Sequence, residues 1–243
     1  MICLSFDTDH LDEARMREFL DDVAVPGAAT FFCTQRYASL GGAHELCPHP
    51  FLQEGVDWEK ELASGRADFP AAVGWRSHSC VYSHLLAQRL AQDGYRYVSI
   101  RDELGARGLA PYREAWGVWH LPIFYMDNLD FSYSRFWGGH RHRPFAPELI
   151  DAALSDDGLY VFDFHPIHLM LNSTSADAYL ERRAGFVSGG PMERLRCDGY
   201  GARDFYDDLS AAMQAAGVRS QTLREALTTY VGDATPTLHR QSA

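Results

Sequence analysis

Short runs of β-forming residues alternate with stretches of helical spacing over most of the sequence. This alternation is typical of βα units around a parallel sheet. Six strands are predicted, at residues 2–6, 29–33, 73–75, 95–100, 118–126 and 159–164. No internal repeat and no linker rich in Pro, Gly or Ser divides the 243 residues. We therefore expect one α/β domain over residues 1–231 and a loose tail over residues 232–243.

Five helices are predicted between and after these strands. In the first, Met16, Phe19 and Val23 recur at spacings of three and four residues, which places them on one helix face. The last has Thr222 and Glu225 at the spacing of a capping box. The other three begin at Ser83, after Pro147 and near Phe205. Residues 35–56 and 128–144 show no sustained period and are predicted to be long loops, which in compact domains are commonly functional.

The charge balance excludes two classes of partner. The chain has 22 Lys and Arg against 33 Asp and Glu, a formal charge of −11. Nucleic acids and anionic membrane surfaces attract basic proteins, so we expect neither as a partner. The first apolar run meets Asp7 far short of a membrane span, and no signal peptide is recognisable. Five widely spaced cysteines indicate reduced thiols and a cytoplasmic protein.

Several common functional motifs are missing from the sequence. It contains no GxGxxG, GxxxxGK[ST] or GxSxG pattern, so dinucleotide-binding, P-loop and α/β-hydrolase functions are not favoured. Residues 44–49, His-Glu-Leu-Cys-Pro-His, are one residue too long for HExxH, and Pro48 would break the helix that such a motif needs. A zincin site is therefore excluded.

Acidic and histidine side chains follow several predicted strands where each strand ends. They are Asp7 and Asp9 after the first strand, His78 after the third and His165 after the last. In parallel α/β folds the carboxyl ends of the strands converge on one site. Carboxylates and imidazoles at such a point are the ligands of metal-dependent hydrolases. The structural alternative for a single residue, such as Asp9, is a helix cap.

These segments resemble the polysaccharide deacetylases of the NodB-homology class, and more closely the deacetylase-like proteins of O-antigen biosynthesis loci. Residues 5–9, Ser-Phe-Asp-Thr-Asp, resemble the family's first motif, and residues 28–34 resemble its second strand. Residues 44–49 resemble the run that leads to the metal-binding histidine, which corresponds to His49. Residues 75–78 resemble its Phe-Arg-x-Pro motif, and residues 159–165 its last strand and catalytic histidine.

The resemblance implies a distorted (β/α) barrel with about seven parallel strands. It also implies one divalent metal, with Zn²⁺ as the expected ion. Asp9 and His49 are the implied metal ligands. The family's second histidine ligand corresponds to Gln53, so His78 is expected to replace it as the third ligand.

The resemblance also assigns catalytic roles. Asp7 is expected to be the general base and His165 the general acid, brought together by closure of the barrel. Arg76 is expected to pair with Asp7 and keep it ionised. Asp127 follows a predicted strand and could orient His165, bind substrate or be a polar loop residue. His168 follows Pro166, so we do not expect it to share a helical face with His165.

The implied reaction is removal of an N-acyl group, acetyl above all, from a nucleotide- or lipid-linked amino sugar of surface polysaccharide synthesis. Aromatic residues near the predicted site could stack on a sugar ring or pack in the core. They are Trp75, Tyr125, Phe136 and Trp137. Two alternatives stay open: a catalytically silent carbohydrate-binding protein, and a metal-dependent hydrolase of a non-carbohydrate amide. The sequence does not indicate the oligomeric state.

Overall fold

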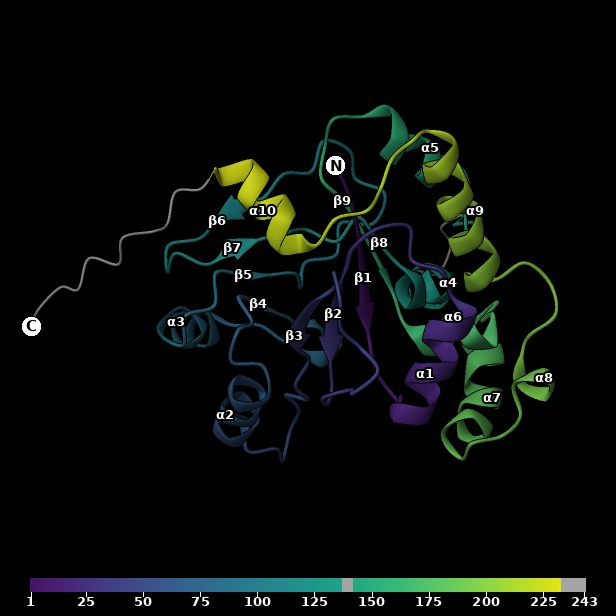
Figure 1. Ribbon diagram of the computed structural model, residues 1–243, viewed down its shortest axis with the longest axis horizontal. Coiled ribbons are helices and arrows are strands. Elements are labelled where there is room, and N and C mark those ends of the chain that lie inside the picture. Colours follow the sequence, from purple (N-terminus) through teal and green to yellow (C-terminus); the bar gives the residue numbers. More distant parts are fainter. Residues whose placement is uncertain (137–141, 233–243) are drawn as a thin grey trace, which may run out of the picture.

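A five-stranded parallel sheet forms the centre of the computed structural model, which describes residues 1–136 and 142–232 (Figure 1). Its strand order is β3-β2-β1-β9-β8. The strands are β1 (Ile2–Asp7), β2 (Ala29–Cys33), β3 (Glu45–Pro48), β8 (Tyr125–Met126) and β9 (Tyr160–Phe164). The first and last of the predicted strands, β1 and β9, are direct neighbours, with Ser5 opposite Asp163. Barrel closure is therefore not needed to bring the two ends of the domain together.

Every residue of β1 is buried, because both faces of the strand are covered. Phe6 points to the helical side, where its ring contacts Phe19 of α1 and Tyr206 of α9. Ser5 and Asp7 alternate with Phe6 and therefore point to the opposite face. The hydrophobic face anchors the strand, and the polar face is left to form a site.

A second sheet of four short strands has the order β4-β5-β7-β6. They are β4 (Gly74–Trp75), β5 (Tyr97–Val98), β6 (Tyr112–Arg113) and β7 (Trp119–His120), with β6 antiparallel to β7. Backbone hydrogen bonds connect the two sheets beyond β3 and β4, where the His78 amide donates to the Pro50 carbonyl at 3.0 Å. The α/β class and the parallel sheet are confirmed. A single closed barrel and a count of seven strands are not confirmed, because the described strands form two sheets.

Ten α-helices are present among the described residues. They are α1 (Glu13–Asp22), α2 (Trp58–Asp68), α3 (His84–Gln92), α4 (Asp127–Phe136), α5 (Glu148–Ser155), α6 (Pro166–Leu171), α7 (Ala176–Val187), α8 (Met192–Leu195), α9 (Ala202–Ala215) and α10 (Leu223–Val231). The five predicted helices are confirmed as α1, α3, α5, α9 and α10, and the capping box of Thr222 and Glu225 is present. In Figure 1, α1, α6, α7, α8 and α9 lie on one side of β1, and α2 and α3 on the other.

Three predicted segments differ from the structure. The predicted loop 35–56 contains β3, whose four residues are too few to show a period. The predicted loop 128–144 begins within α4. The buried face of α4 includes the charged residue Asp130 beside Phe131, so the apolar spacing that predicts a helix is interrupted. The predicted strand 118–126 is divided into β7 and β8, because Pro122 between them has no amide hydrogen for a sheet ladder. The predicted tail lies, beyond Gly232, outside the described residues.

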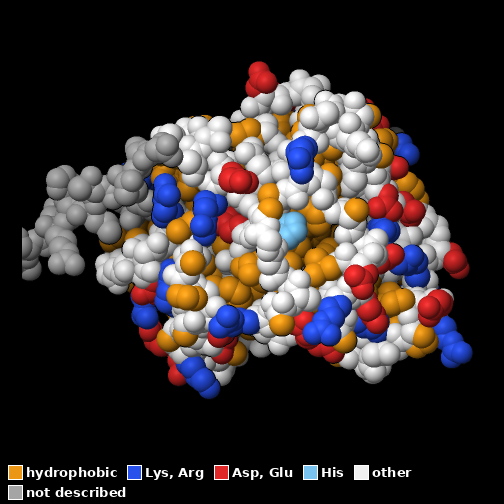
Figure 2. Space-filling model, viewed as in Figure 1, with side chains coloured by type: hydrophobic (Ala, Val, Ile, Leu, Met, Phe, Trp, Pro, Cys, Tyr) orange, Lys and Arg blue, Asp and Glu red, His pale blue; other side chains and the backbone are white. Residues whose placement is uncertain are grey.

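On the face in Figure 2, basic and acidic side chains are interspersed. Among residues 1–136 and 142–232, no helix is long and apolar enough to cross a membrane.

The close approach of β4 to β5 requires glycine at position 74. A Cβ atom there would lie 2.2 Å from the Tyr97 hydroxyl, and Tyr97 is fully buried with a 2.7 Å hydrogen bond to Glu45. Gly74→Ala should lower the free energy of unfolding by about 1–3 kcal/mol, the usual cost of overpacking. Gly41→Ala is the control, because a Cβ at Gly41 meets nothing within 4 Å. Urea unfolding of both variants tests this; equal stabilities would contradict the packing argument.

Candidate active site

Two carboxylates at the end of β1 face the same space. Asp7 is the last residue of β1, and Asp9 follows it after Thr8. The buried Thr8 is held by its amide, which donates to the Phe32 carbonyl, and by its hydroxyl, which accepts from the Thr34 amide at 3.1 Å. Oδ2 of Asp7 and Oδ2 of Asp9 both approach Nε2 of His49, at 3.6 and 3.4 Å. The intervening Thr8 therefore does not separate the two acids in space.

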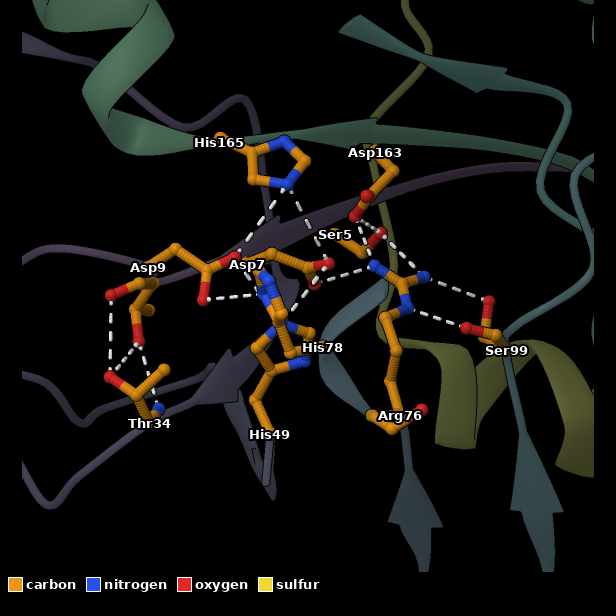
Figure 3. A network of polar contacts seen from close by, with 12 residues as sticks. Ser5, Asp7, Asp9, Thr34, His49, Arg76, His78, Ser99, Asp163 and His165 are labelled. Carbon is orange, nitrogen blue, oxygen red and sulfur yellow. Dashed lines mark hydrogen bonds and ion pairs between the residues drawn. The ribbon is translucent and has the colours of Figure 1, made fainter. Parts of the chain in front are cut away.

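Asp9 contacts two histidines from different elements (Figure 3). Its Oδ2 is 3.4 Å from Nε2 of His49, which follows β3, and its Oδ1 is 3.1 Å from Nδ1 of His78, which follows β4. Asp9 and His49 are buried, whereas the His78 side chain is 35% exposed at the pocket. Gln53, by contrast, is exposed on the surface.

Interactions between opposite charges shift the pKa values of Asp9 and His49 against the effect of burial. Burial alone would raise the pKa of Asp9, but His49 and His78 hold it well below its ordinary value. Burial alone would lower the pKa of His49, but the Asp7 and Asp9 carboxylates raise it. Each group therefore depends on the opposite charge of the other in this arrangement.

The donors of Asp9, His49 and His78 fit a divalent metal. One ligand atom from each residue lies within 4.8 Å of the other two. Neither ring nitrogen of the buried His49 has a hydrogen-bond partner. A buried nitrogen without a partner lowers the stability of the fold unless a ligand binds to that nitrogen. One carboxylate and two imidazoles are a common catalytic zinc set, with room for one more ligand.

Two other groups of Asp and His residues also meet the distance criterion among the described residues. They are Asp127, His165 and His168, and Asp7, Asp163 and His165. In the first group both Asp127 oxygens bind His165, and Nδ1 of His168 is 3.2 Å from the Ser173 hydroxyl. In the second group Asp7 and Asp163 each accept from Arg76, whose positive charge opposes a cation there. The Asp9 group is therefore the best candidate for the metal.

A buried arginine connects the general-base candidate to both sheets. Arg76 follows β4 and is fully buried. Its Nη1 donates to Asp7 Oδ1 at 2.7 Å and also to Asp163 Oδ1, while its Nη2 donates to the Ser99 hydroxyl at 2.9 Å. The predicted pairing of Arg76 with Asp7 is thus present in the geometry. It leaves Oδ2 of Asp7 facing His49 and His165 at 3.6 and 4.0 Å.

Asp163 is a member of this network that the sequence analysis missed. It is fully buried and accepts a 2.6 Å hydrogen bond from Ser5 in addition to its contact with Arg76. Burial raises the pKa of Asp163, and the positive charge of Arg76 opposes that rise. The signal in the sequence was the pair Asp163 and His165, two residues apart at the end of a strand, which places both on one face.

His165 is held by Asp127. The Asp127 carboxylate accepts from the His165 amide at 2.8 Å and contacts Nδ1 of its ring at 2.7 Å. Because a carboxylate only accepts, Nδ1 carries a proton and Nε2 faces the Asp7 and Asp9 carboxylates. Burial would lower the pKa of His165, but Asp127 and then Asp7 raise it to about 10. Asp127 is fully buried, so among its predicted roles the geometry agrees with orienting His165.

A pocket of about 510 Å³ opens beside these residues. Asp9, His78 and His165 line one end of it. Three non-glycine residues with positive φ also line it: His10, Ser79 and Cys80, at 62°, 56° and 52°. Uncommon backbone conformations of this kind concentrate at functional sites.

The family model described as WbmS-like polysaccharide deacetylase matches residues 4–183, well over half of the chain. The chain belongs to this family. Every predicted catalytic and metal-binding residue lies inside the matched range. The resemblance inferred from the motifs is thereby confirmed.

Three solved structures are similar to this polysaccharide deacetylase family member. A Bordetella bronchiseptica protein, assigned to polysaccharide deacetylation in O-antigen biosynthesis, is 24% identical over 86% of this chain and 89% of its own, with a TM-score of 0.68. A Mycobacterium smegmatis protein with a polysaccharide deacetylase assignment is 21% identical, with coverages of 91% and 92% and a TM-score of 0.47. The 4-alpha-glucanotransferase of Thermococcus litoralis is 13% identical, with coverages of 94% and 38% and a TM-score of 0.51. The Bordetella structure supports the fold. A comparison with curated proteins gives no match.

The aromatic residues predicted near the site have different positions. Trp75 is 1% exposed and Tyr125 is fully buried, so in this family member both rings pack in the core, with Tyr125 against Phe162 and Phe205. The Phe136 side chain and Trp137 lie outside the described residues. Neither Trp75 nor Tyr125 lines the pocket beside His165.

The expectation for His168 is wrong. Pro166 is the first residue of α6, where a missing amide hydrogen costs nothing, and His165 occupies the N-cap position before it. His168 therefore lies in the first turn of α6, with its ring centroid 5.1 Å from that of His165. It is 3% exposed and lines the pocket.

The metal assignment predicts the effect of removing each histidine. His49→Ala and His78→Ala should each lower zinc affinity by at least about 100-fold, since even outer-shell changes cost 10–100-fold. His84→Ala on the exposed start of α3 is the control and should bind zinc normally. Zinc titration of the folded proteins measures this. Unchanged zinc affinity in His78→Ala would remove it from the ligand set.

Proposed function

We propose that this family member is a metal-dependent hydrolase that removes an N-acyl group, acetyl above all, from an amino sugar. The observation that carries the proposal is the close approach of Asp7 and His165 to the Asp9, His49 and His78 group, with Asp7 Oδ2 3.6 Å from His49 Nε2 and His165 Nε2 3.8 Å from Asp9 Oδ2. A base, an acid and a metal-binding group next to one another are the parts that amide hydrolysis needs. A silent binding protein would have no need of all three.

The metal that fits Asp9, His49 and His78 is Zn²⁺ or a similar divalent ion. When bound it supplies a Lewis acid for the acyl oxygen and makes water easier to deprotonate. Asp9 contributes the negative charge of the ligand set, and the two imidazoles contribute neutral donors.

Asp7 acts as the general base. Arg76 occupies its Oδ1, so the other oxygen is free to accept a proton from the attacking water. The hydrogen bond from the guanidinium also fixes the orientation of the Asp7 carboxylate. Arg76 itself touches no substrate atom in this scheme; it positions Asp7.

His165 acts as the general acid. Its Nδ1 proton stays with Asp127, and the proton on Nε2 goes to the departing nitrogen as the carbon–nitrogen bond breaks. The raised pKa of His165, about 10, keeps the ring protonated at neutral pH. The products are a carboxylic acid and the free amine of the sugar.

The proposal extends to a nucleotide- or lipid-linked intermediate of surface polysaccharide synthesis as substrate and to the cytoplasm as the place of action. The assignment of the Bordetella protein to O-antigen biosynthesis supports the first. The five unpaired cysteines support the second.

The role of Asp7 predicts a loss of turnover without loss of metal. Asp7→Asn keeps the size of the side chain and should lower turnover by about 10²–10⁴-fold, the usual contribution of a general base. Acetate release from N-acetylated sugars, measured on protein with a full complement of zinc, tests this. Near-normal turnover in zinc-loaded Asp7→Asn would rule out the base assignment.

The role of His165 predicts that the loss depends on the leaving group. His165→Gln should slow hydrolysis of an N-acetyl sugar by about 10²–10⁴-fold, because an amine leaves only with a proton. Hydrolysis of p-nitrophenyl acetate should fall much less, since nitrophenolate leaves unprotonated. His84→Gln is the control for both substrates. An equal loss on both substrates would show that His165 does not deliver the proton.

A further inference from the structure

The pocket beside His165 is lined by one side chain with an unused hydrogen-bond acceptor. Asn128 lines it from the first turn of α4, and its Oδ1 is buried without a hydrogen-bond partner. Among the described residues that line the pocket, no other side chain has a buried nitrogen or oxygen without a partner. A buried polar atom of this kind needs an explanation, and a ligand that binds it is one.

Asn128 is held close to the candidate general acid. Its backbone amide donates to Oδ1 of Asp127 at 2.6 Å, and the same oxygen is 2.7 Å from Nδ1 of His165. Asp127 is fully buried, so these contacts fix the start of α4 next to His165. Because Asn128 and His165 both line the pocket, a sugar ring whose nitrogen meets His165 has the Asn128 side chain nearby.

The side-chain amide of Asn128 can turn toward such a ligand. The residue as a whole is half-buried at the pocket. The torsion about the Cβ–Cγ bond of asparagine has broad minima, so the amide rotates at little cost. Because Oδ1 has no partner, this rotation breaks no hydrogen bond at that oxygen.

The other polar groups of the pocket favour a neutral ligand with hydroxyl groups. The described residues that line it include two carboxylates, Asp9 and Asp102, and no Lys or Arg. A phosphate or carboxylate on the ligand would lack a basic partner among them. Carboxylates and an amide oxygen accept hydrogen bonds, and a sugar hydroxyl can donate one. Ser132, four residues after Asn128 and on the same face of α4, adds a hydroxyl to this side of the pocket.

We propose that Asn128 determines specificity by accepting a hydrogen bond from a ring hydroxyl of the amino-sugar substrate. This inference rests on the proposed N-deacylase function and narrows its substrate class to N-acyl amino sugars with a free hydroxyl at the position that meets Asn128. A sugar in which that hydroxyl is missing, or is blocked by an ether or acyl group, leaves Oδ1 unpaired and is a poorer substrate.

The test combines a variant of the protein with variants of the sugar. The substrates are N-acetylglucosamine and its 3-deoxy, 4-deoxy and 6-deoxy analogues, each as the methyl glycoside and as the UDP-linked sugar. Acetate release gives kcat/KM for the zinc-loaded wild-type and Asn128→Leu proteins; leucine is close to asparagine in size and accepts no hydrogen bond.

With the wild-type protein, at least one analogue should have a kcat/KM at least about 10-fold below that of the parent sugar, because it lacks the hydroxyl that meets Oδ1. Asn128→Leu should lower kcat/KM for the parent sugar by a similar factor. For that analogue, Asn128→Leu should cause no further loss.

Two controls separate the hydrogen bond from a change in the shape of the site. p-Nitrophenyl acetate has no hydroxyl, so Asn128→Leu should hydrolyse it at a nearly normal rate and should bind zinc normally. Gln92→Leu makes the same change from amide to aliphatic side chain at an exposed position on α3. It should leave the losses on the deoxy sugars as they are in the wild-type protein.

The outcomes separate this inference from the proposed function. An unchanged kcat/KM in Asn128→Leu, or a loss that is equal for the parent sugar and all three analogues, would overturn the role of Asn128. An equal loss on p-nitrophenyl acetate would overturn it too, because the substitution would then act through the shape of the site. These results leave the deacylase function standing, whereas no acyl release from any sugar would overturn both.

Discussion

The buried guanidinium of Arg76 is the interaction on which the rest of the site depends. It follows β4 of the four-stranded sheet and bonds Ser99 next to β5, yet it also bonds Asp7 of β1 and Asp163 of β9 in the five-stranded sheet. Removing one partner of a buried ion pair costs about 3–5 kcal/mol, because the other charge is left unpaired. Arg76 therefore connects the two sheets and fixes the orientation of Asp7 at the same time.

The convergence of the site could be predicted from the sequence because it follows from strand direction. β1, β3, β4 and β9 run parallel to their sheet neighbours, so the residues after their carboxyl ends meet at one edge. This rule alone brought Asp7, Asp9, His78 and His165 together. The proposal that His78 replaces the lost histidine ligand follows from the same rule, since His78 comes after β4 and its ring contacts Asp9.

Other features could not be predicted, because they depend on register and tertiary partners. Glu45 can lie in the buried strand β3 because its carboxylate accepts hydrogen bonds from Thr30, Tyr97 and Arg224. Trp75 lies in β4 and Asp163 in β9. The sequence alone does not tell which face of each strand packs in the core and which faces the site. In the sequence Pro166 argues against a helix, yet at the first helical position, which it occupies in α6, proline favours one.

The most direct measurement is a crystal structure of the protein grown with zinc and recorded at the zinc absorption edge. We expect one anomalous peak per chain, about 2.0–2.2 Å from a carboxylate oxygen of Asp9 and from one ring nitrogen each of His49 and His78. Asp7 should remain bound to Arg76 and outside the metal's ligand set. A peak held instead by Asp127, His165 and His168, or by Asp7, Asp163 and His165, would contradict the proposed division of metal ligands, base and acid.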